Sequence, residues 1–147
     1  MIRLHPTTLS AAAAGLLLLS GPVLAQDAGG DGTVTLTFET GAPTGAVMVA
    51  LYDSPAAYSG GRPVGQVKLD VAAGETIATF EGLPAGDYAA KAFHDVDGDG
   101  EMNLNPFGIP SEPYAFSNNA VGNMGPASWE RARFAVSGPV AQTIRLR

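Results

Sequence analysis

The segment TVTLTFE, residues 33–39, alternates polar and apolar side chains along its whole length. A period of two is typical of a half-buried β-strand, because successive side chains of a strand point to opposite faces of a sheet. We therefore expect Val34, Leu36 and Phe38 to face a hydrophobic core. Similar short segments recur along the chain after residue 45, and none of them has the 3.6-residue period of an amphipathic helix.

Six further strands are expected, each bounded by residues that favour turns. They cover residues 46–52, 64–71, 75–81, 87–94, 131–136 and 140–146. Seven short strands without helices predict an all-β fold, a seven-stranded antiparallel β-sandwich. Transthyretin-like and immunoglobulin-like topologies both agree with the pattern, because periodicity does not encode the order of strands.

Residues 95–129, between the fifth and sixth expected strands, show no clear period. A loop of this length in a compact domain is usually either functional or disordered. Its many apolar residues argue against disorder, so we predict one long ordered loop that folds back over the sandwich. These expected apolar anchors are Leu104, Phe107, Ile109, Tyr114, Phe116, Met124 and Trp129.

The first 25 residues have the pattern of a signal peptide. Arg3 is followed by an apolar run over residues 9–19, and the small residues before position 26 suit cleavage after Ala25. The apolar run is shorter than the roughly 20 residues that span a bilayer, so we expect no stable transmembrane anchor after cleavage. The sequence thus predicts a periplasmic or secreted protein with a flexible leader at residues 26–32 and a single β-sandwich domain at residues 33–147.

The composition excludes several classes of function. The chain of 147 residues has eight basic and 14 acidic residues and a net charge of −6, which becomes about −7 without Arg3. No basic patch is present, so nucleic-acid binding is disfavoured. The chain has no Cys, which excludes disulfides, thiol catalysis and thiolate metal sites. Packing must therefore hold the domain together, and a bound metal could assist it.

The segment HDVDGDGEMN, residues 94–103, places a carboxylate at every second position from 95 to 101. Like charges this close repel each other unless water or a cation screens them. Calcium binds six to eight oxygen ligands, and alternating Asp residues on a turning loop supply such ligands. The sequence therefore predicts a structural calcium site. Its expected ligands are Asp95, Asp97, Asp99, Glu101 and Asn103.

This segment resembles the start of an EF-hand loop but not its end. Asp95, Asp97 and Asp99 fit the first three ligand positions, and Gly100 fits the required glycine. Pro106 stands at the twelfth position, where the pattern needs a bidentate Glu, and no flanking helices are predicted. A calcium loop on a β scaffold would take its last ligand from elsewhere, and a solvated acidic turn is the alternative. The candidates for that last ligand are Asp53, Glu112 and Glu130.

A second candidate site is the polar cluster of Ser117, Asn118 and Asn119, which Tyr114 and Trp129 frame in the sequence. Aromatic rings combined with amides suit a sugar or a peptide, so this cluster is a candidate ligand surface for an unknown protein or glycan partner. We favour the other interpretation, in which the Asn side chains cap turns and satisfy backbone groups of the loop.

No catalytic set is convincing. His94 is the only histidine after the expected signal peptide, whereas zinc sites usually need several His or Cys ligands. Ser117, His94 and Asp95 could be combined into a hydrolase triad, but no Ser lies in a nucleophile-elbow motif. Adjacent residues on a strand also point to opposite faces. We therefore expect a non-enzymatic protein, with a carbohydrate- or peptide-binding module of the cell envelope as the alternative and a hydrolase as the least supported function.

Four blocks of the sequence resemble a bacterial family of exported proteins known only as domain of unknown function 2141. They are FEGLPAGDY at residues 80–88, FHD at 93–95, FGIP at 107–110 and FSNN at 116–119. The resemblance spans residues 33–146 and implies an exported β-domain without a known reaction or ligand. The GLPAGDY block is also similar to a turn of transthyretin-like regulatory and pilin-type sandwich domains. Tyr88 in this block is either a tyrosine corner or an ordinary packed aromatic residue.

Overall fold

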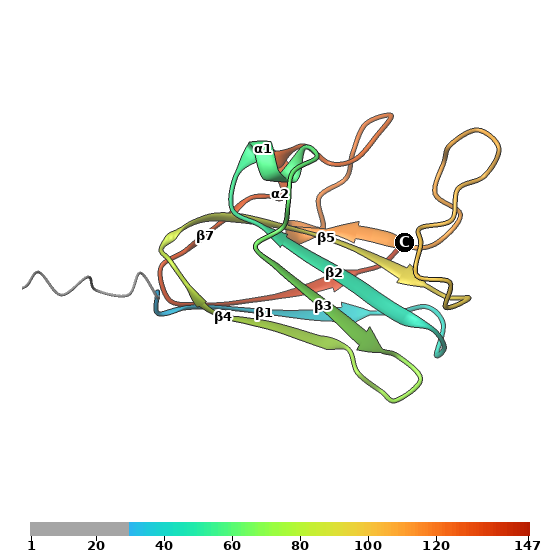
Figure 1. The fold of residues 1–147 in the computed structure, drawn as a ribbon, viewed down its shortest axis with the longest axis horizontal. Coiled ribbons are helices and arrows are strands. Elements are labelled where there is room, and N and C mark those ends of the chain that lie inside the picture. The colour runs from blue at the N-terminus through green and yellow to red at the C-terminus, as the bar shows by residue number, and fades with distance from the viewer. Residues whose placement is uncertain (1–29) are drawn as a thin grey trace, which may run out of the picture.

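The computed structural model describes residues 30–147, which form eight β-strands (Figure 1). Two one-turn helices, α1 (Pro55–Tyr58) and α2 (Trp129–Ala132), and a 3-10 turn, η1 (Ser117–Asn119), lie in the connections. The strands are β1 (Gly32–Glu39), β2 (Ala46–Tyr52), β3 (Gly65–Asp70), β4 (Ile77–Leu83), β5 (Gly86–Asp95), β6 (Tyr114–Phe116), β7 (Phe134–Val136) and β8 (Pro139–Arg145).

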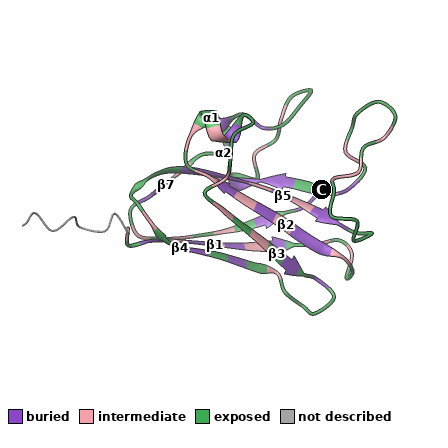
Figure 2. Ribbon diagram, viewed as in Figure 1, coloured by how far each residue is buried: buried purple, intermediate pink, exposed green. Residues whose placement is uncertain are grey.

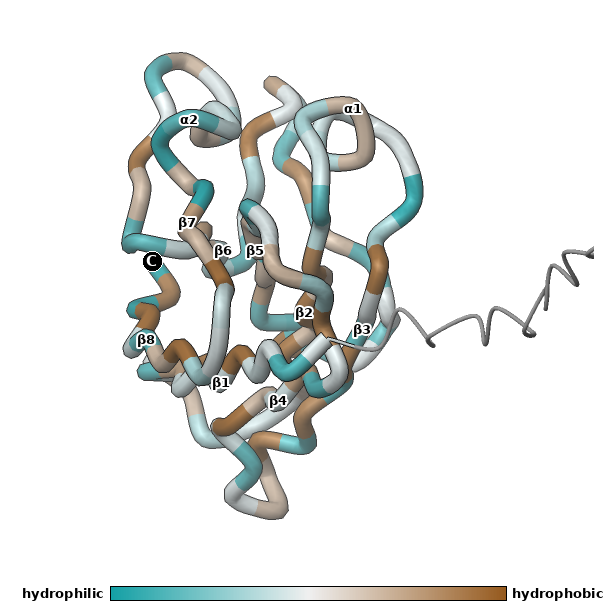
Figure 3. Tube along the Cα trace, turned by 90° about the vertical axis from the view of Figure 1, so that its left-hand side faces the viewer, coloured by the Kyte–Doolittle hydropathy of each residue, from teal (hydrophilic) through white to brown (hydrophobic). Residues whose placement is uncertain are grey.

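The strands form two sheets that pack face to face. One sheet has the order β4-β1-β8, and the other has the order β3-β2-β5-β6 with β7 also paired to β5. Figure 3 shows hydrophobic positions recurring along the strands of both sheets. As the alternation predicts, Val34, Leu36 and Phe38 are buried at no more than 3% exposure, and they share one core with residues of the opposite sheet such as Val47 and Leu51.

The strand count predicted from the sequence was one too low. The extra strand, β6, lies inside the expected long loop and pairs with β5 in the register Lys91↔Phe116 to Phe93↔Tyr114. Its three residues are too few to display a period. The loop prediction is corrected accordingly, because residues 95–129 return to the sheet at β6 and η1 before α2 begins. The first part of the expected sixth strand is helical, and only β7 is extended there.

The expectation of a wholly antiparallel sandwich was also wrong for one pair. β1 runs parallel to β8, from Thr33↔Pro139 to Glu39↔Arg145, whereas the other paired strands are antiparallel. Alternation predicts which face of a strand is buried, but it contains no information on strand direction. The chain also changes sheets between β3 and β4, which do not pair with each other.

A second, smaller core covers the outer face of β5. Ala89 lies under the aromatic rings of Tyr58, Phe116 and Trp129, which come from α1, β6 and α2. Figure 1 shows both helices above β5, and Figure 2 shows buried residues in this layer. The layer fixes η1 and the end of β6, where the predicted ligand surface lies.

The turn before β5 is closed by a tyrosine. The Tyr88 hydroxyl donates a hydrogen bond to the Pro84 carbonyl at 2.8 Å, and the Tyr88 ring is buried in the main core. This contact ties a side chain to backbone four residues upstream, as in a tyrosine corner.

The expected signal peptide, residues 1–25, and residues 26–29 of the expected leader lie outside the described residues. Gly32 already belongs to β1, and the Gly30 amide donates to the Gly82 carbonyl at 3.2 Å. Among the described residues, no helix is both long and apolar enough to cross a membrane.

Candidate functional site

Asp95 is the last residue of β5 and the first residue of the acidic loop, residues 95–103. The Asp95 side chain is fully buried, and its two carboxylate oxygens accept hydrogen bonds from the amides of Gly98 at 2.8 Å and Gly100 at 2.9 Å. Both glycines have positive φ, at 80° and 84°, a region that side chains other than glycine rarely adopt. The glycines therefore let the backbone wrap around the Asp95 carboxylate.

The next two acidic residues turn toward the same point. Asp97 accepts from the Asp99 amide at 3.2 Å, and Asp99 accepts from the Glu101 amide at 2.8 Å. One carboxylate oxygen each from Asp95, Asp97 and Asp99 lies within 4.8 Å of the others. Two oxygens bound to one calcium ion at about 2.4 Å are at most about 5 Å apart. These three side chains are therefore close enough to hold one metal ion.

The electrostatics of this loop favour a cation. Asp97 and Asp99 are exposed, and Asp95 is buried beside them. No Lys or Arg occurs between Lys91 and Arg131 in the sequence, so no basic residue of this segment can neutralise the three charges. Carboxylates held this close repel one another, which a bound cation would relieve.

The other two predicted ligands are placed differently. The Glu101 side chain is exposed and is not part of the group of converging carboxylates. The side-chain amide nitrogen of Asn103 donates a hydrogen bond to the Asp97 carboxylate at 2.8 Å. Asn103 therefore orients Asp97, one of the predicted metal ligands.

Glu112 closes the acidic loop. Its side chain is only 8% exposed, and its two oxygens accept from the amides of Val96 at 2.8 Å and Asn103 at 3.1 Å. Glu112 thus joins the two ends of the loop, although sequence reasoning could not choose it over Asp53 and Glu130. None of these three candidates for the last ligand belongs to the converging group of carboxylates.

Of the predicted apolar anchors, Phe116 and Trp129 are buried, but residues 104–110 are ordered by polar contacts and not by apolar burial. The side-chain oxygen of Asn105 accepts from the amides of Phe107 at 2.9 Å and Ile109 at 3.1 Å. Phe107 is 87% exposed, and Leu104 and Ile109 are each more than half exposed. These three apolar side chains therefore face solvent. Residues 104–110 form a hairpin that a bridge between Leu104 and Pro110 closes, and the Asn105 contacts shape its turn.

His94 is a structural residue of β5. Its side chain is fully buried, and Nε2 lies 2.6 Å from the Thr44 carbonyl, which makes Nε2 the donor in this contact. Nδ1 is buried and has no hydrogen-bond partner among the described residues.

The polar cluster at η1 is engaged in holding the fold. Ser117 is fully buried, accepts from the Ala90 amide at 2.9 Å and donates to the Ala132 carbonyl at 2.5 Å. Asn119 donates to the Thr143 carbonyl at 2.9 Å and accepts from the Arg145 amide at 2.8 Å.

Asn118 continues these contacts. Its amide nitrogen donates to the carbonyls of Arg131 at 3.1 Å and Arg133 at 2.9 Å, and its oxygen accepts from Gln142. Asn118 and Asn119 together satisfy groups on the outer edge of β8 and in α2. Both have positive φ, at 61° and 51°, which asparagine tolerates better than most residues.

The two predicted aromatic residues are separated by burial. Trp129 is buried in the second core, where its ring centroid lies 5.8 Å from that of Tyr58. Tyr114 is 36% exposed and packs edge to face against Phe116, with 5.9 Å between centroids. Among the residues of the predicted ligand surface, Tyr114 and Asn119 lie together on the outside of the domain, whereas Ser117 and Trp129 are buried.

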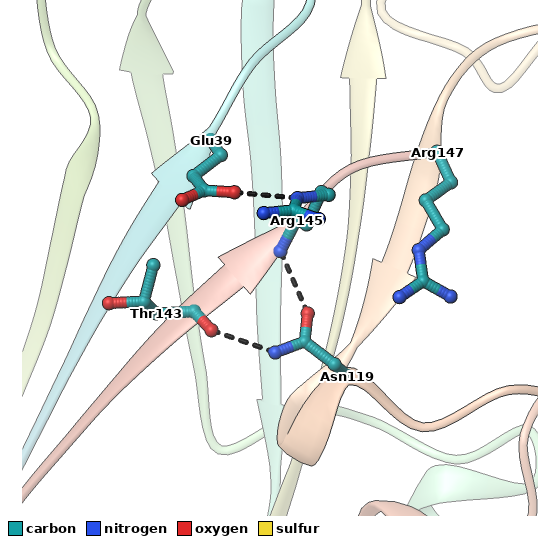
Figure 4. Close-up of a pocket in the computed structure, with 5 residues that line it drawn as sticks. All are labelled: Glu39, Asn119, Thr143, Arg145 and Arg147. Carbon is teal, nitrogen blue, oxygen red and sulfur yellow. Dashed lines mark hydrogen bonds and ion pairs between the residues drawn. The ribbon is translucent and has the colours of Figure 1, made fainter.

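Tyr114 and Asn119 line a shallow groove that sequence reasoning missed. It consists of two adjoining hollows of about 240 and 210 Å³, and both contain Asn119, Arg145 and Arg147 in their walls. Figure 4 shows the first hollow, with Glu39 and Arg145 on one side and Arg147 on the other. The second hollow adds the Tyr114 side and Val121.

A second missed feature is a lysine held between tyrosines. The Lys91 ammonium lies 4.2 Å from the centroid of the Tyr58 ring and 5.2 Å from that of Tyr52. Burial lowers the pKa of Lys91. Burial, assisted by neighbouring Tyr52, raises the pKa of Tyr58 to about 12, and the Tyr58 hydroxyl donates to the Ala127 carbonyl at 2.9 Å.

This raised pKa predicts a loss of stability in strong alkali. A folded-state pKa above the ordinary value of 10 means that neutral Tyr58 stabilises the fold below pH 10, and this contribution is lost as the pH rises through 12. We expect the advantage of wild type over Tyr58→Phe in unfolding free energy to shrink by about 2–3 kcal/mol between pH 9 and 12. The pKa of Lys91 is shifted in the opposite direction, but Lys91 is present in both the wild type and the Tyr58→Phe variant. Urea unfolding at both pH values measures this change, and a constant difference would contradict it.

One comparison with known proteins found a match. Residues 30–144 match the family described as an uncharacterized protein conserved in bacteria, domain of unknown function 2141. The chain belongs to this family. The match confirms the resemblance seen in the sequence blocks. The domain of unknown function 2141 here includes the acidic loop and the groove residues Glu39, Tyr114 and Asn119, whereas Arg145 and Arg147 lie beyond the matched range. No curated protein and no solved structure matches the chain.

Proposed function

We propose that this member of the family is an exported, non-enzymatic β-sandwich protein whose acidic loop holds a structural calcium ion. The convergence of Asp95, Asp97 and Asp99 within 4.8 Å supports this proposal most directly. Oxygen-only ligands favour a hard cation, and the exposure of Asp97 and Asp99 leaves room for the additional water ligands of calcium.

The ion would act on the fold and not on a substrate. It would neutralise three carboxylates at the end of β5 and fix the start of the hairpin, whose base is already tied by Glu112. Metal binding to a site that forms only in the folded state adds to folding free energy. A chain without Cys has no disulfides for that purpose.

The contacts of the triad candidates support a non-enzymatic role. Ser117 is hydrogen-bonded to backbone groups of β5 and α2, and His94 Nε2 contacts the Thr44 carbonyl. Each Asp95 oxygen accepts a hydrogen bond from a glycine amide, so this carboxylate does not orient the His94 ring. The exported location rests on the signal-peptide pattern of residues 1–25. The two facing sheets agree with a transthyretin-like or immunoglobulin-like sandwich.

Calorimetric titration of the metal-free protein with calcium tests the proposal. We expect one ion per chain, and Asp97→Asn should weaken binding at least tenfold because it removes a charged ligand. Asp31→Asn is the matched control, since Asp31 is exposed and lies outside the acidic group, and it should bind calcium like wild type. Absence of heat with wild type, or equal binding by Asp97→Asn, would reject the site.

The groove beside β8 supports a second candidate function, a carbohydrate- or peptide-binding module of the cell envelope. Its wall combines the partly exposed Tyr114 side chain with polar and charged groups, as sugar- and peptide-binding surfaces do. An array of neutral and acidic glycans and peptides tests this candidate, and a complete lack of binding would reject it.

A further inference from the structure

The groove beside β8 contains two arginines on a strongly acidic protein, and among the described residues only one of them pairs with a carboxylate side chain. Arg145 Nε lies 2.7 Å from a Glu39 carboxylate oxygen, so the charge of Arg145 has a partner. Within residues 30–147, Arg147 forms no ion pair. Figure 4 shows the Arg147 guanidinium on the side of the hollow opposite Glu39. The groove therefore has a free cationic end.

The walls of this groove are held in place by hydrogen bonds. Arg147 and Tyr114 exchange two backbone hydrogen bonds, at 3.0 and 3.2 Å, and the Tyr114 ring is supported by Phe116. Arg131 donates to the Val121 carbonyl at 3.2 Å and so fixes the facing segment. A preformed groove loses little conformational entropy when a ligand binds.

The chemistry of the walls narrows the class of ligand. Both polar atoms of the Asn119 side-chain amide are already bonded to the backbone of β8, and Arg145 is paired with Glu39. The cation of the groove without an ion-pair partner among the described residues is therefore the Arg147 guanidinium. Guanidinium groups bind planar carboxylates through two parallel hydrogen bonds. The Tyr114 ring and the 55% exposed Val121 offer apolar surface next to it.

The size of the hollows sets an upper limit on the ligand. Each hollow, at about 240 and 210 Å³, is smaller than the 300–1,000 Å³ typical of sites for drug-sized molecules. One hollow therefore fits a single ring and its substituents.

We infer that this groove binds a carboxylate-bearing sugar ring, as found in uronic acid residues of acidic glycans. The carboxylate lies against Arg147, and the ring lies against Tyr114 and Val121. This inference rests on the second candidate function, which it narrows to acidic glycans, and it does not depend on calcium.

Titration with four small probes, followed by NMR chemical shifts at low salt, tests the class of ligand. Glucuronate carries both the ring and the carboxylate, glucose only the ring, acetate only the carboxylate, and inorganic phosphate is an unrelated anion. We expect glucuronate to bind at least tenfold more tightly than each of the other three. Equal or tighter binding of phosphate would overturn the inference in favour of a general anion site.

Three variants test the assigned residues. Arg147→Gln should weaken glucuronate binding at least tenfold, while Arg62→Gln, an exposed arginine outside the groove, should leave it within twofold of wild type. Glu39→Gln should strengthen binding severalfold, because it releases the charge of Arg145. Unchanged melting temperatures establish that the variants fold.

The outcomes of these experiments distinguish the inferred binding of carboxylate-bearing sugars from the more general glycan-binding function on which it rests. Binding of neutral glycans that Arg147→Gln does not alter would overturn the inference and leave the glycan-binding function standing. No binding of any glycan, on the array or in the titration, would reject both.

Discussion

Calcium at about 100 times its dissociation constant should raise the melting temperature of the metal-free protein by about 10 °C. A ligand at this excess stabilises the folded state by about 2.7 kcal/mol. A domain of this size gains about 4 °C for each kcal/mol. The physical source is the relief of repulsion among Asp95, Asp97 and Asp99, whose oxygens converge within 4.8 Å. Differential scanning calorimetry with excess chelator and with millimolar calcium measures the change.

The variant Asp97→Asn should show two effects of opposite sign. Its melting temperature should not respond to calcium, yet in chelator it should be at least as stable as wild type, because one of three mutually repelling charges is gone. Asp31→Asn should keep the full response to calcium. Magnesium should raise the melting temperature less, since it demands a nearly ideal octahedral site. Equal melting temperatures of wild type in chelator and in calcium would exclude a structural calcium ion.

Replacement of Ser117 by Ala should lower the free energy of unfolding by about 3 kcal/mol. The Ser117 hydroxyl is fully buried and satisfies both the Ala90 amide and the Ala132 carbonyl. Each buried polar group that loses its partner costs about 1–3 kcal/mol. Urea unfolding followed by circular dichroism measures the loss as a lower midpoint with an unchanged slope.

Ser111→Ala is the matched control for this substitution. The Ser111 hydroxyl also donates one hydrogen bond, to the Asn103 carbonyl at 3.0 Å, but at an exposed position where water can replace it. We expect this variant to lose less than 1 kcal/mol. A similarly small loss in Ser117→Ala would show that Ser117 does not join α2 to β5 in the way the structure indicates.

The parts of this fold that the sequence predicts are those with a local signal. β1 was predicted because one face of the strand is buried and the other is not, which imposes a period of two on residues 33–39. β6 has only three residues and left no such signal. The parallel direction of β8 relative to β1 depends on the path of the intervening chain, which alternation does not record.

The acidic site also has one part that the sequence predicts and another part that required the structure. Asp95, Asp97 and Asp99 converge because of their spacing and the glycines between them, and both features are readable in the sequence. Glu112 reaches the loop only because the hairpin returns, so its role required the structure. Phe107 was predicted to be an anchor because it is apolar, but hydrophobicity alone does not decide which side of a hairpin faces the domain.

The groove could not have been predicted from the sequence. It joins Glu39, Asn119 and Arg145, which are far apart in the chain and meet only when β8 pairs with β1 and η1 covers its edge. Arg145 and Arg147 alternate with apolar residues at the end of the chain, which is also the ordinary pattern of a solvent-facing strand surface.

The place of β1 between β4 and β8 also determines the order in which the domain can fold. Glu39 and its ion-pair partner Arg145 are 106 residues apart, and β1 leaves the ribosome long before β8 does. Until residues 139–145 arrive, one hydrogen-bonding edge of β1 stays open, and contacts this distant in sequence form slowly. The sheet therefore closes only after the rest of the domain has been synthesised. A chain truncated before β8 retains an exposed strand edge of the kind that promotes aggregation.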